Sequence, residues 1–143
     1  MKRTSRLIAA SVLIIGPAFA QHEADAPKPV DVDAKGEPPS QEACFNVREV
    51  EDFSALDDLH VYLEGRRSDQ HYLLTMFQGC VGLRGAIGIA ISNEISRVCS
   101  NDNARVTYRG FGRVETCPIE KVEAVEDRES AEALATVRSK QRR

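Results

Sequence analysis

Several sequence patterns that would indicate enzymatic or metal chemistry are missing from this chain. It has no Gly-x-Ser-x-Gly motif, no His-Glu-x-x-His motif and no Walker-type phosphate loop. Its four cysteines also lack the close spacing that zinc fingers and Cys-x-x-Cys oxidoreductases use. These absences predict a protein without a metal or cofactor and, as the first hypothesis, a protein that is not an enzyme.

The chain also lacks an excess of basic residues: acidic residues outnumber them, and the formal net charge is -3. Nucleic-acid binding depends on clustered Lys and Arg that neutralise phosphates, so no nucleic-acid partner is expected. The apolar run at residues 7–15 is far shorter than the roughly 20 residues of a membrane-spanning helix. No transmembrane segment is therefore expected after the N-terminal segment has been removed.

That N-terminal segment has the parts of a secretory signal peptide. Residues 1–6 are basic, residues 7–15 are apolar, and the small residues of Ala18-Phe19-Ala20 are typical of a cleavage site. We therefore predict cleavage of residues 1–20 and a periplasmic or secreted location. The first cysteine of the chain is Cys44, so a lipid anchor on an N-terminal cysteine is not expected.

The remaining chain divides by composition into a linker, one domain and a tail. Residues 21–42 contain four of the six prolines and no apolar periodicity, which predicts a disordered linker. Residues 43–126 are predicted to form a disulfide-stabilised β domain. Residues 127–143 have only Leu134 and Val137 as large apolar residues, so we expect a charged tail that is either a frayed helix or disordered.

Within the domain, apolar residues recur with the period of two that indicates β-strands. Residues 59–64 and 71–77 are predicted to form a hairpin with His71 opposite Glu64. Residues 87–91 are predicted as a third strand.

The other predicted elements complete a mainly β fold, a small antiparallel sheet that is curled or barrel-like. In the third strand, Ile87, Ile89 and Ile91 are expected to share one face. One short helical turn is expected at residues 52–58, and a C-terminal helix is one alternative for residues 127–143. Further strands are expected at residues 44–50, 95–99, 105–108 and 117–125.

The four cysteines of an exported domain are most simply explained by two disulfides. Three pairings exist, and the sequence leaves all of them open. The pairing we favour joins Cys44 to Cys117, at the two terminal strands, and Cys80 to Cys99, around the central segment. In the loop-entropy model these bridges would contribute roughly 4.5 and roughly 3 kcal/mol.

A basic strand offers a candidate site for an anion or a partner. Arg105 and Arg109 are expected on one strand face, with Arg113 beyond the Gly110-Phe111-Gly112 turn. Such a patch on an acidic protein can bind a carboxylate or a lipid phosphate. The alternative is a solvated strand face without a partner.

Several short motifs of the domain occur together in a known family. The motifs are Cys80-Val-Gly-Leu, Arg97-Val-Cys-Ser-Asn-Asp, Cys117-Pro-Ile, and Cys44 with Leu56-Asp57-Asp58. With them, residues 43–125 resemble a family of small exported proteins of Gram-negative bacteria that is catalogued as a domain of unknown function. The resemblance implies a bridged periplasmic or secreted domain, and it supplies neither an activity nor site residues.

Three functional hypotheses follow. The first is a non-catalytic module that binds an unknown protein or envelope component, or that has a structural role. The second is an inhibitor of a basic envelope-degrading enzyme such as a lysozyme, acting through residues 65–70 or 109–113. The third is a small hydrolase that uses His60 or His71 with Glu64 and nearby carboxylates. The sequence leaves the oligomeric state open.

Overall fold

The computed structural model describes residues 36–142, so the predicted signal peptide at residues 1–20 lies outside the described part. One helix, α1 (Arg128–Gln141), follows the strands, and two 3-10 turns lie at Val47–Glu49 and Leu83–Gly85. The strands are β1 (Gln41–Glu42), β2 (Cys44–Asn46), β3 (Val50–Ala55), β4 (His60–Gly65), β5 (His71–Met76), β6 (Ile89–Ser92), β7 (Arg97–Cys99), β8 (Arg105–Gly110) and β9 (Arg113–Ala124).

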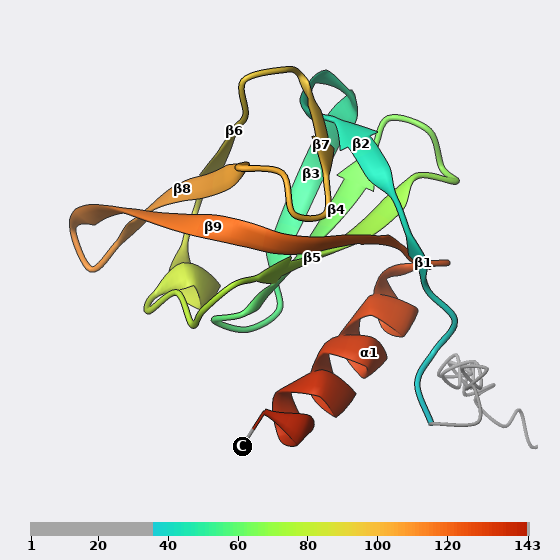
Figure 1. Ribbon diagram of the computed structural model, residues 1–143. Coiled ribbons are helices and arrows are strands. Elements are labelled where there is room, and N and C mark those ends of the chain that lie inside the picture. The colour runs from blue at the N-terminus through green and yellow to red at the C-terminus, as the bar shows by residue number, and fades with distance from the viewer. Residues whose placement is uncertain (1–35, 143) are drawn as a thin grey trace, which may run out of the picture.

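Seven of these strands form one antiparallel sheet in the order β3-β4-β5-β9-β8-β6, with β1 added to β9. The long strand β9 pairs with β5 along one part and with β8 along another, which lets the sheet curl back on itself (Figure 1). The ribbon formed by β2 and β7 contributes Phe45 and Val98 to the same core. The mainly antiparallel, barrel-like fold predicted from the sequence is therefore confirmed.

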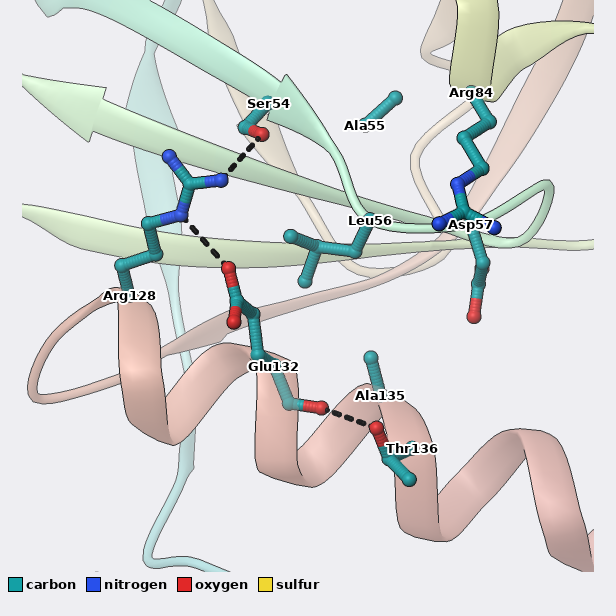
Figure 2. Close-up of a pocket in the computed structure, with 9 residues that line it drawn as sticks. All are labelled: Ser54, Ala55, Leu56, Asp57, Arg84, Arg128, Glu132, Ala135 and Thr136. Carbon is teal, nitrogen blue, oxygen red and sulfur yellow. Dashed lines mark hydrogen bonds and ion pairs between the residues drawn. The ribbon is translucent and has the colours of Figure 1, made fainter. Parts of the chain in front are cut away.

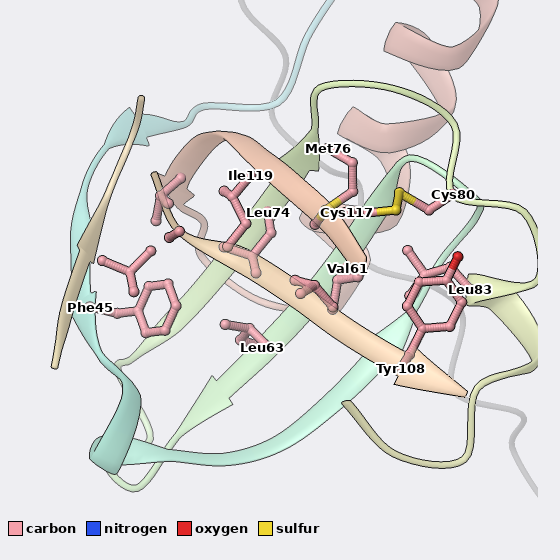
Figure 3. Packing of buried hydrophobic residues seen from close by; sticks show 14 residues of the cluster. Phe45, Val61, Leu63, Leu74, Met76, Cys80, Leu83, Tyr108, Cys117 and Ile119 are labelled. Carbon is pink, nitrogen blue, oxygen red and sulfur yellow. A yellow bond between two sulfur atoms is a disulfide. The ribbon is translucent and has the colours of Figure 1, made fainter. Parts of the chain in front are cut away.

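The interior of the curled sheet holds the main hydrophobic core (Figure 3). Val61 and Leu63 of β4, Leu74 of β5 and Val122 of β9 are fully buried there, at 0% exposure. The alternation of β4 places Val61 and Leu63 on the inner face, as its sequence pattern predicts. Ile119, Val106, Tyr108 and Leu83 extend the core toward the other end of the molecule.

The predicted hairpin is present, and β4 pairs with β5 so that Glu64 lies opposite His71. Its outer face is not solvated, however, because His60 and Tyr62 are buried as well. The reason is α1, which lies across this face of the sheet in Figure 1. Tyr62 and Leu73 form a second cluster with Leu134 of the helix.

The C-terminal helix that was one alternative for residues 127–143 is confirmed as α1, and it packs on the sheet through small side chains. Ala131, Leu134 and Ala135 are buried, and small residues let the helix approach the sheet closely. The Asp127 side chain caps the helix by accepting the N–H of Ser130 at 2.8 Å. A short apolar face is therefore sufficient to hold α1 on the sheet when polar contacts support it.

Two local predictions also fail. Residues 52–58 do not form a helical turn, because Val50–Ala55 is strand β3, paired with β4 at the sheet edge. The spacing of Phe53 and Leu56 indicated one helical face, but the two side chains pack against different hydrophobic clusters. Ile87 precedes β6 and is 98% exposed, so it does not share a buried face with Ile89 and Ile91.

All four cysteines are bridged, but the favoured pairing is wrong. The disulfides join Cys44 to Cys99 and Cys80 to Cys117. Strand register explains the first, since Cys44 and Cys99 are directly opposite each other in the β2–β7 ribbon, with Cα atoms 4.2 Å apart. The second joins the loop after β5 to β9. Within residues 36–142, no helix is long and apolar enough to cross a membrane.

Candidate functional site

A network of polar groups, partly buried, lies between α1 and the outer face of the sheet. Asp57 accepts the backbone N–H groups of Leu59 and His60, both at 2.7 Å, and the His60 Nδ1 at 2.9 Å. Ser139 of α1 donates to the other oxygen of this carboxylate at 2.7 Å. Burial raises the pKa of Asp57, but the hydrogen bonds from His60, Ser139 and Leu59 outweigh burial, so the pKa is lower than usual.

Neither histidine of the domain is placed as an accessible general base. His60 is fully buried, and its Nε2 has no hydrogen-bond partner within the described residues. His71 donates from Nε2 to the Ser68 carbonyl at 2.9 Å and accepts at Nδ1 from the Tyr62 hydroxyl at 2.7 Å. The predicted register with Glu64 holds, yet both ring nitrogens of His71 bind other groups.

A second anchor of α1 is the carboxylate of Glu123, which is only 2% exposed. Arg138 of α1 forms a bidentate ion pair with it, and Lys121 donates to it at 2.8 Å. Burial raises the pKa of Glu123, but the hydrogen bonds from Arg138 and Lys121 outweigh burial and bring this pKa to about 2. This cluster has the properties of a structural anchor, because the protein's own cations saturate the carboxylate.

A groove of about 340 Å³ lies between α1 and the end of β3 (Figure 2). In it, Arg128 reaches across to the Ser54 hydroxyl at 3.2 Å and to Glu132 at 2.8 Å. These groups therefore bind one another across the groove, which Asp57 and Arg84 also line. Nothing in this arrangement indicates a particular ligand.

The predicted arginine patch is divided by the strand register. Arg105 and Arg109 lie on the same face of β8, as expected. Arg113 lies opposite Gly110 in β9, which places it with Glu115 on the face that bears the buried Cys117. The three arginines therefore do not form one strand face, although Arg109 and Arg113 flank the same turn.

That turn, at the tip of the β8–β9 hairpin, presents an aromatic side chain to solvent. Phe111 and Gly112 both have positive φ, of 47° and 79°, as the two central residues of a type I′ hairpin turn require. Phe111 is 85% exposed. A large side chain in this backbone region costs about 1 kcal/mol, and glycine or asparagine is usual there.

The loop between β5 and β6 supports the tip from one side. Cys80 fixes it to β9 through the disulfide with Cys117, and the Cys80 N–H donates to the Asp58 carbonyl at 2.7 Å. The Tyr108 hydroxyl donates to the Val81 carbonyl at 3.0 Å.

Gly82 of this loop brings the backbone close to the tip. Its φ is +85°, and a Cβ at this position would come within 2.9 Å of the Phe111 ring. The positive φ favours glycine at this position, and the loop lies directly against the hairpin tip.

We define the tip surface as the exposed side chains of Val81, Arg84, Arg109, Phe111 and Arg113. Shallow hollows of about 490 and 370 Å³ lie on either side of Val81 and Phe111, the first beside Arg84 and Arg109 and the second beside Arg113. None of these arginines forms an ion pair within residues 36–142.

Exposed apolar side chains are concentrated in the two segments that form the tip surface. Of six large apolar residues that are exposed in the described chain, five come from residues 77–88 and 109–114. The exception is Ile95. The sequence predicted Arg109, Arg113 and the turn between them, but it did not single out Phe111 as a contact residue. The position of Phe111 between two glycines was the available signal. No cluster of metal-ligating residues occurs in the part of the chain that the structure describes.

Comparison with known proteins places the chain in a family. The model of the family of unknown function DUF6491 matches residues 1–141, and the chain belongs to this family. No curated protein and no solved structure matches the chain. The resemblance to a family of unknown function is thus confirmed, over a longer part of the chain than residues 43–125. A Gram-negative origin and export stay predictions.

Proposed function

We propose that this member of the family is an exported, non-catalytic binding domain whose partner contacts the tip surface. The observation that carries the proposal is the combination of an exposed Phe111 with three arginines that form no ion pair within residues 36–142, on a disulfide-anchored scaffold. Exposed apolar patches mark interaction sites more often than isolated surface residues do. Arginine adds selectivity for anions, because its planar group binds carboxylate and phosphate in a bidentate manner.

Export is supported by two features. The two disulfides are typical of oxidising compartments, which indicates a protein outside the cytoplasm. The N-terminal residues have the pattern of a signal peptide. The periplasm or the cell exterior is therefore the compartment we propose.

The competing hypotheses receive less support from the geometry. A hydrolase built on His60 or His71 would need an accessible imidazole, and these two side chains are engaged in structural hydrogen bonds. An inhibitor of a basic enzyme would present acidic loops, whereas residues 109–113 carry two arginines and no carboxylate. Residues 65–70 carry two arginines and one aspartate.

Site-specific photo-crosslinking in living cells tests the proposal. A photoreactive phenylalanine analogue replaces Phe111 in one strain and Ile95, which is also exposed, in a second strain. We expect adducts from position 111 that disappear when Arg84, Arg109 and Arg113 are all replaced by glutamine.

The adducts are to be identified by mass spectrometry, because the analogue reacts with lipids as well as with proteins. The absence of adducts at position 111, or equal adducts from position 95, would contradict a specific binding surface. A cytoplasmic protein with an intact N-terminus would contradict export.

A further inference from the structure

We propose that the tip surface docks on an anionic phospholipid bilayer, with Phe111 entering the interfacial region and the arginines binding lipid phosphates. This inference rests on the proposed function and names the partner of the same surface. It is carried by the arrangement of apolar and cationic side chains around a single hairpin turn.

The apolar part of the tip surface is at its most protruding point. The β8–β9 hairpin extends away from the rest of the sheet in Figure 1, and Phe111 is one of the two residues at its turn. Val81, 71% exposed, lies on the supporting loop beside it. Aromatic and aliphatic side chains in such a position can enter a bilayer without any change in the fold, and the water released from their surface favours entry.

The cations flank this apex. Arg109 and Arg113 each stand two positions from Phe111 along the chain, and Arg84 lines the hollow beside it. Long arginine side chains can hold their charge at the level of the phosphates while their apolar stems follow the inserted residue. The geometry therefore matches the order of a bilayer surface, in which phosphates lie above an apolar interior.

Charge also favours a bilayer of anionic lipids. Residues 77–88 and 109–114 hold three arginines and no acidic residue, in a chain whose net charge is -3. Asp58 and Glu115 line the two hollows, so the local excess of positive charge is small and contact must be close to be effective. Each basic residue near an anionic membrane strengthens binding roughly fivefold.

A protein partner fits the tip surface less well. Stable protein interfaces bury about 800 Å² on each partner and include a well-packed, largely uncharged core. Here the apolar residues form a convex apex with an arginine on either side along the chain. An apex of this kind needs no complementary pocket when the partner is a fluid bilayer.

The chain contains no tryptophan, so a single introduced indole reports on insertion. Phe111→Trp places it at the apex, and Ile95→Trp is the matched control at an exposed apolar residue outside the tip surface. Vesicles of phosphatidylcholine alone are compared with vesicles that also contain phosphatidylglycerol. We expect a blue-shifted and brighter emission from F111W only with the anionic vesicles, and no change from I95W.

Sedimentation with the same vesicles measures the contribution of charge. The variant R84Q/R109Q/R113Q should bind roughly a hundredfold more weakly, since three basic contacts are lost. The matched variant R48Q/R66Q/R67Q removes the same charge from exposed arginines elsewhere and should bind nearly as well as the parent. Added salt should weaken binding of the parent protein.

Several outcomes would overturn the inference. The first is an equal loss of vesicle binding in both triple variants, and the second is equal binding of the parent protein to charged and uncharged vesicles. The third is a change in F111W emission with dissolved glycerol phosphate that equals the change with anionic vesicles, which would indicate a site for the free anion. Emission from F111W that vesicles leave unchanged would also overturn it. If crosslinks from position 111 then carry protein alone, the binding function stands without a membrane partner; if no crosslinks form, both proposals fail.

Discussion

Glu123 shows how a single residue can determine the acid stability of this molecule. Its carboxylate is buried, yet it stays ionised because Arg138 and Lys121 hold it. A buried charge that lost these partners would be costly, since its desolvation would no longer be offset. The Arg138 contact also attaches the end of α1 to β9, so protonation of this one group weakens the attachment of a whole helix.

The pKa of Glu123 predicts a pH dependence of stability. The pKa is about 2 in the folded protein and 4.5 in the unfolded chain, so the stabilisation is fully present above pH 4.5. It is lost as the pH falls from 4.5 toward 2, and it amounts to about 3 kcal/mol.

Urea unfolding at a series of pH values measures this effect in Glu123→Gln. We expect a loss of about 2 to 3 kcal/mol at neutral pH and a flatter pH profile below 4.5 than in the parent. Glu51→Gln, at an exposed position of β3, is the control and should keep the parent profile. A parent-like slope in the Glu123 variant would show that another group causes the acid transition.

At the scale of the element, α1 and the β8–β9 hairpin follow different rules. The helix is held by a small apolar face and by contacts at both ends, from the Asp127 cap to the Arg138 ion pair. The hairpin is held by the pairing of β8 with β9, and its turn places Phe111, an unfavourable residue there, at positive φ. Strained positions of this type are common at functional sites, where binding compensates for the local cost.

The hairpin turn predicts a trade-off between stability and binding. Phe111→Asn should leave the free energy of unfolding unchanged or raise it by up to about 1 kcal/mol, because asparagine tolerates the left-handed region. The same variant should lose roughly tenfold in binding to anionic vesicles, because the inserted ring is gone. Thermal unfolding and vesicle sedimentation measure the two quantities.

The comparison variant for this turn is Gly112→Ala, which introduces a Cβ where φ is 79°. It should destabilise the hairpin while keeping Phe111. A large loss of stability in the Phe111 variant would mean that the ring is needed for folding, and it would remove the argument that strain is retained for function.

At the scale of the whole molecule, the two disulfides have separate tasks. Cys44–Cys99 closes the β2–β7 ribbon and joins cysteines 55 positions apart, while Cys80–Cys117 joins cysteines 37 positions apart and fixes the tip loop. In the loop-entropy model each contributes about 4 kcal/mol. That is a large share of the roughly 5 to 15 kcal/mol by which domains are usually stable.

Removal of each bridge should therefore have a distinct result. Replacing Cys44 and Cys99 by serine should lower stability and leave vesicle binding intact in the protein that remains folded. Replacing Cys80 and Cys117 should lower stability by a similar amount and also weaken vesicle binding, because the loop beside Phe111 is released.

Peptide mapping without reduction checks the pairing itself. Peptides that join Cys44 to Cys99 and Cys80 to Cys117 are expected. Peptides that join Cys44 to Cys117 would show that the strand arrangement described above is wrong.

The sequence by itself determined the local features of this protein. Alternation in residues 59–64 and 71–77 predicted the hairpin and even its Glu64–His71 register, because a period of two depends only on neighbouring residues. Composition likewise predicted the single β domain and two disulfides. The family to which the chain belongs could be anticipated from its cysteine motifs, although its function could not.

Only the tertiary structure decided which distant segments meet. The cysteine pairing, the burial of His60 beneath α1 and the contact of Phe111 with Gly82 all depend on strand order and on how the sheet curls. The sequence pattern of β4 predicts that the face bearing His60 is solvated, because α1, the helix that covers it, lies about eighty positions away along the chain. The tip surface is assembled in the same way, from two loops that only the curling of the sheet brings together.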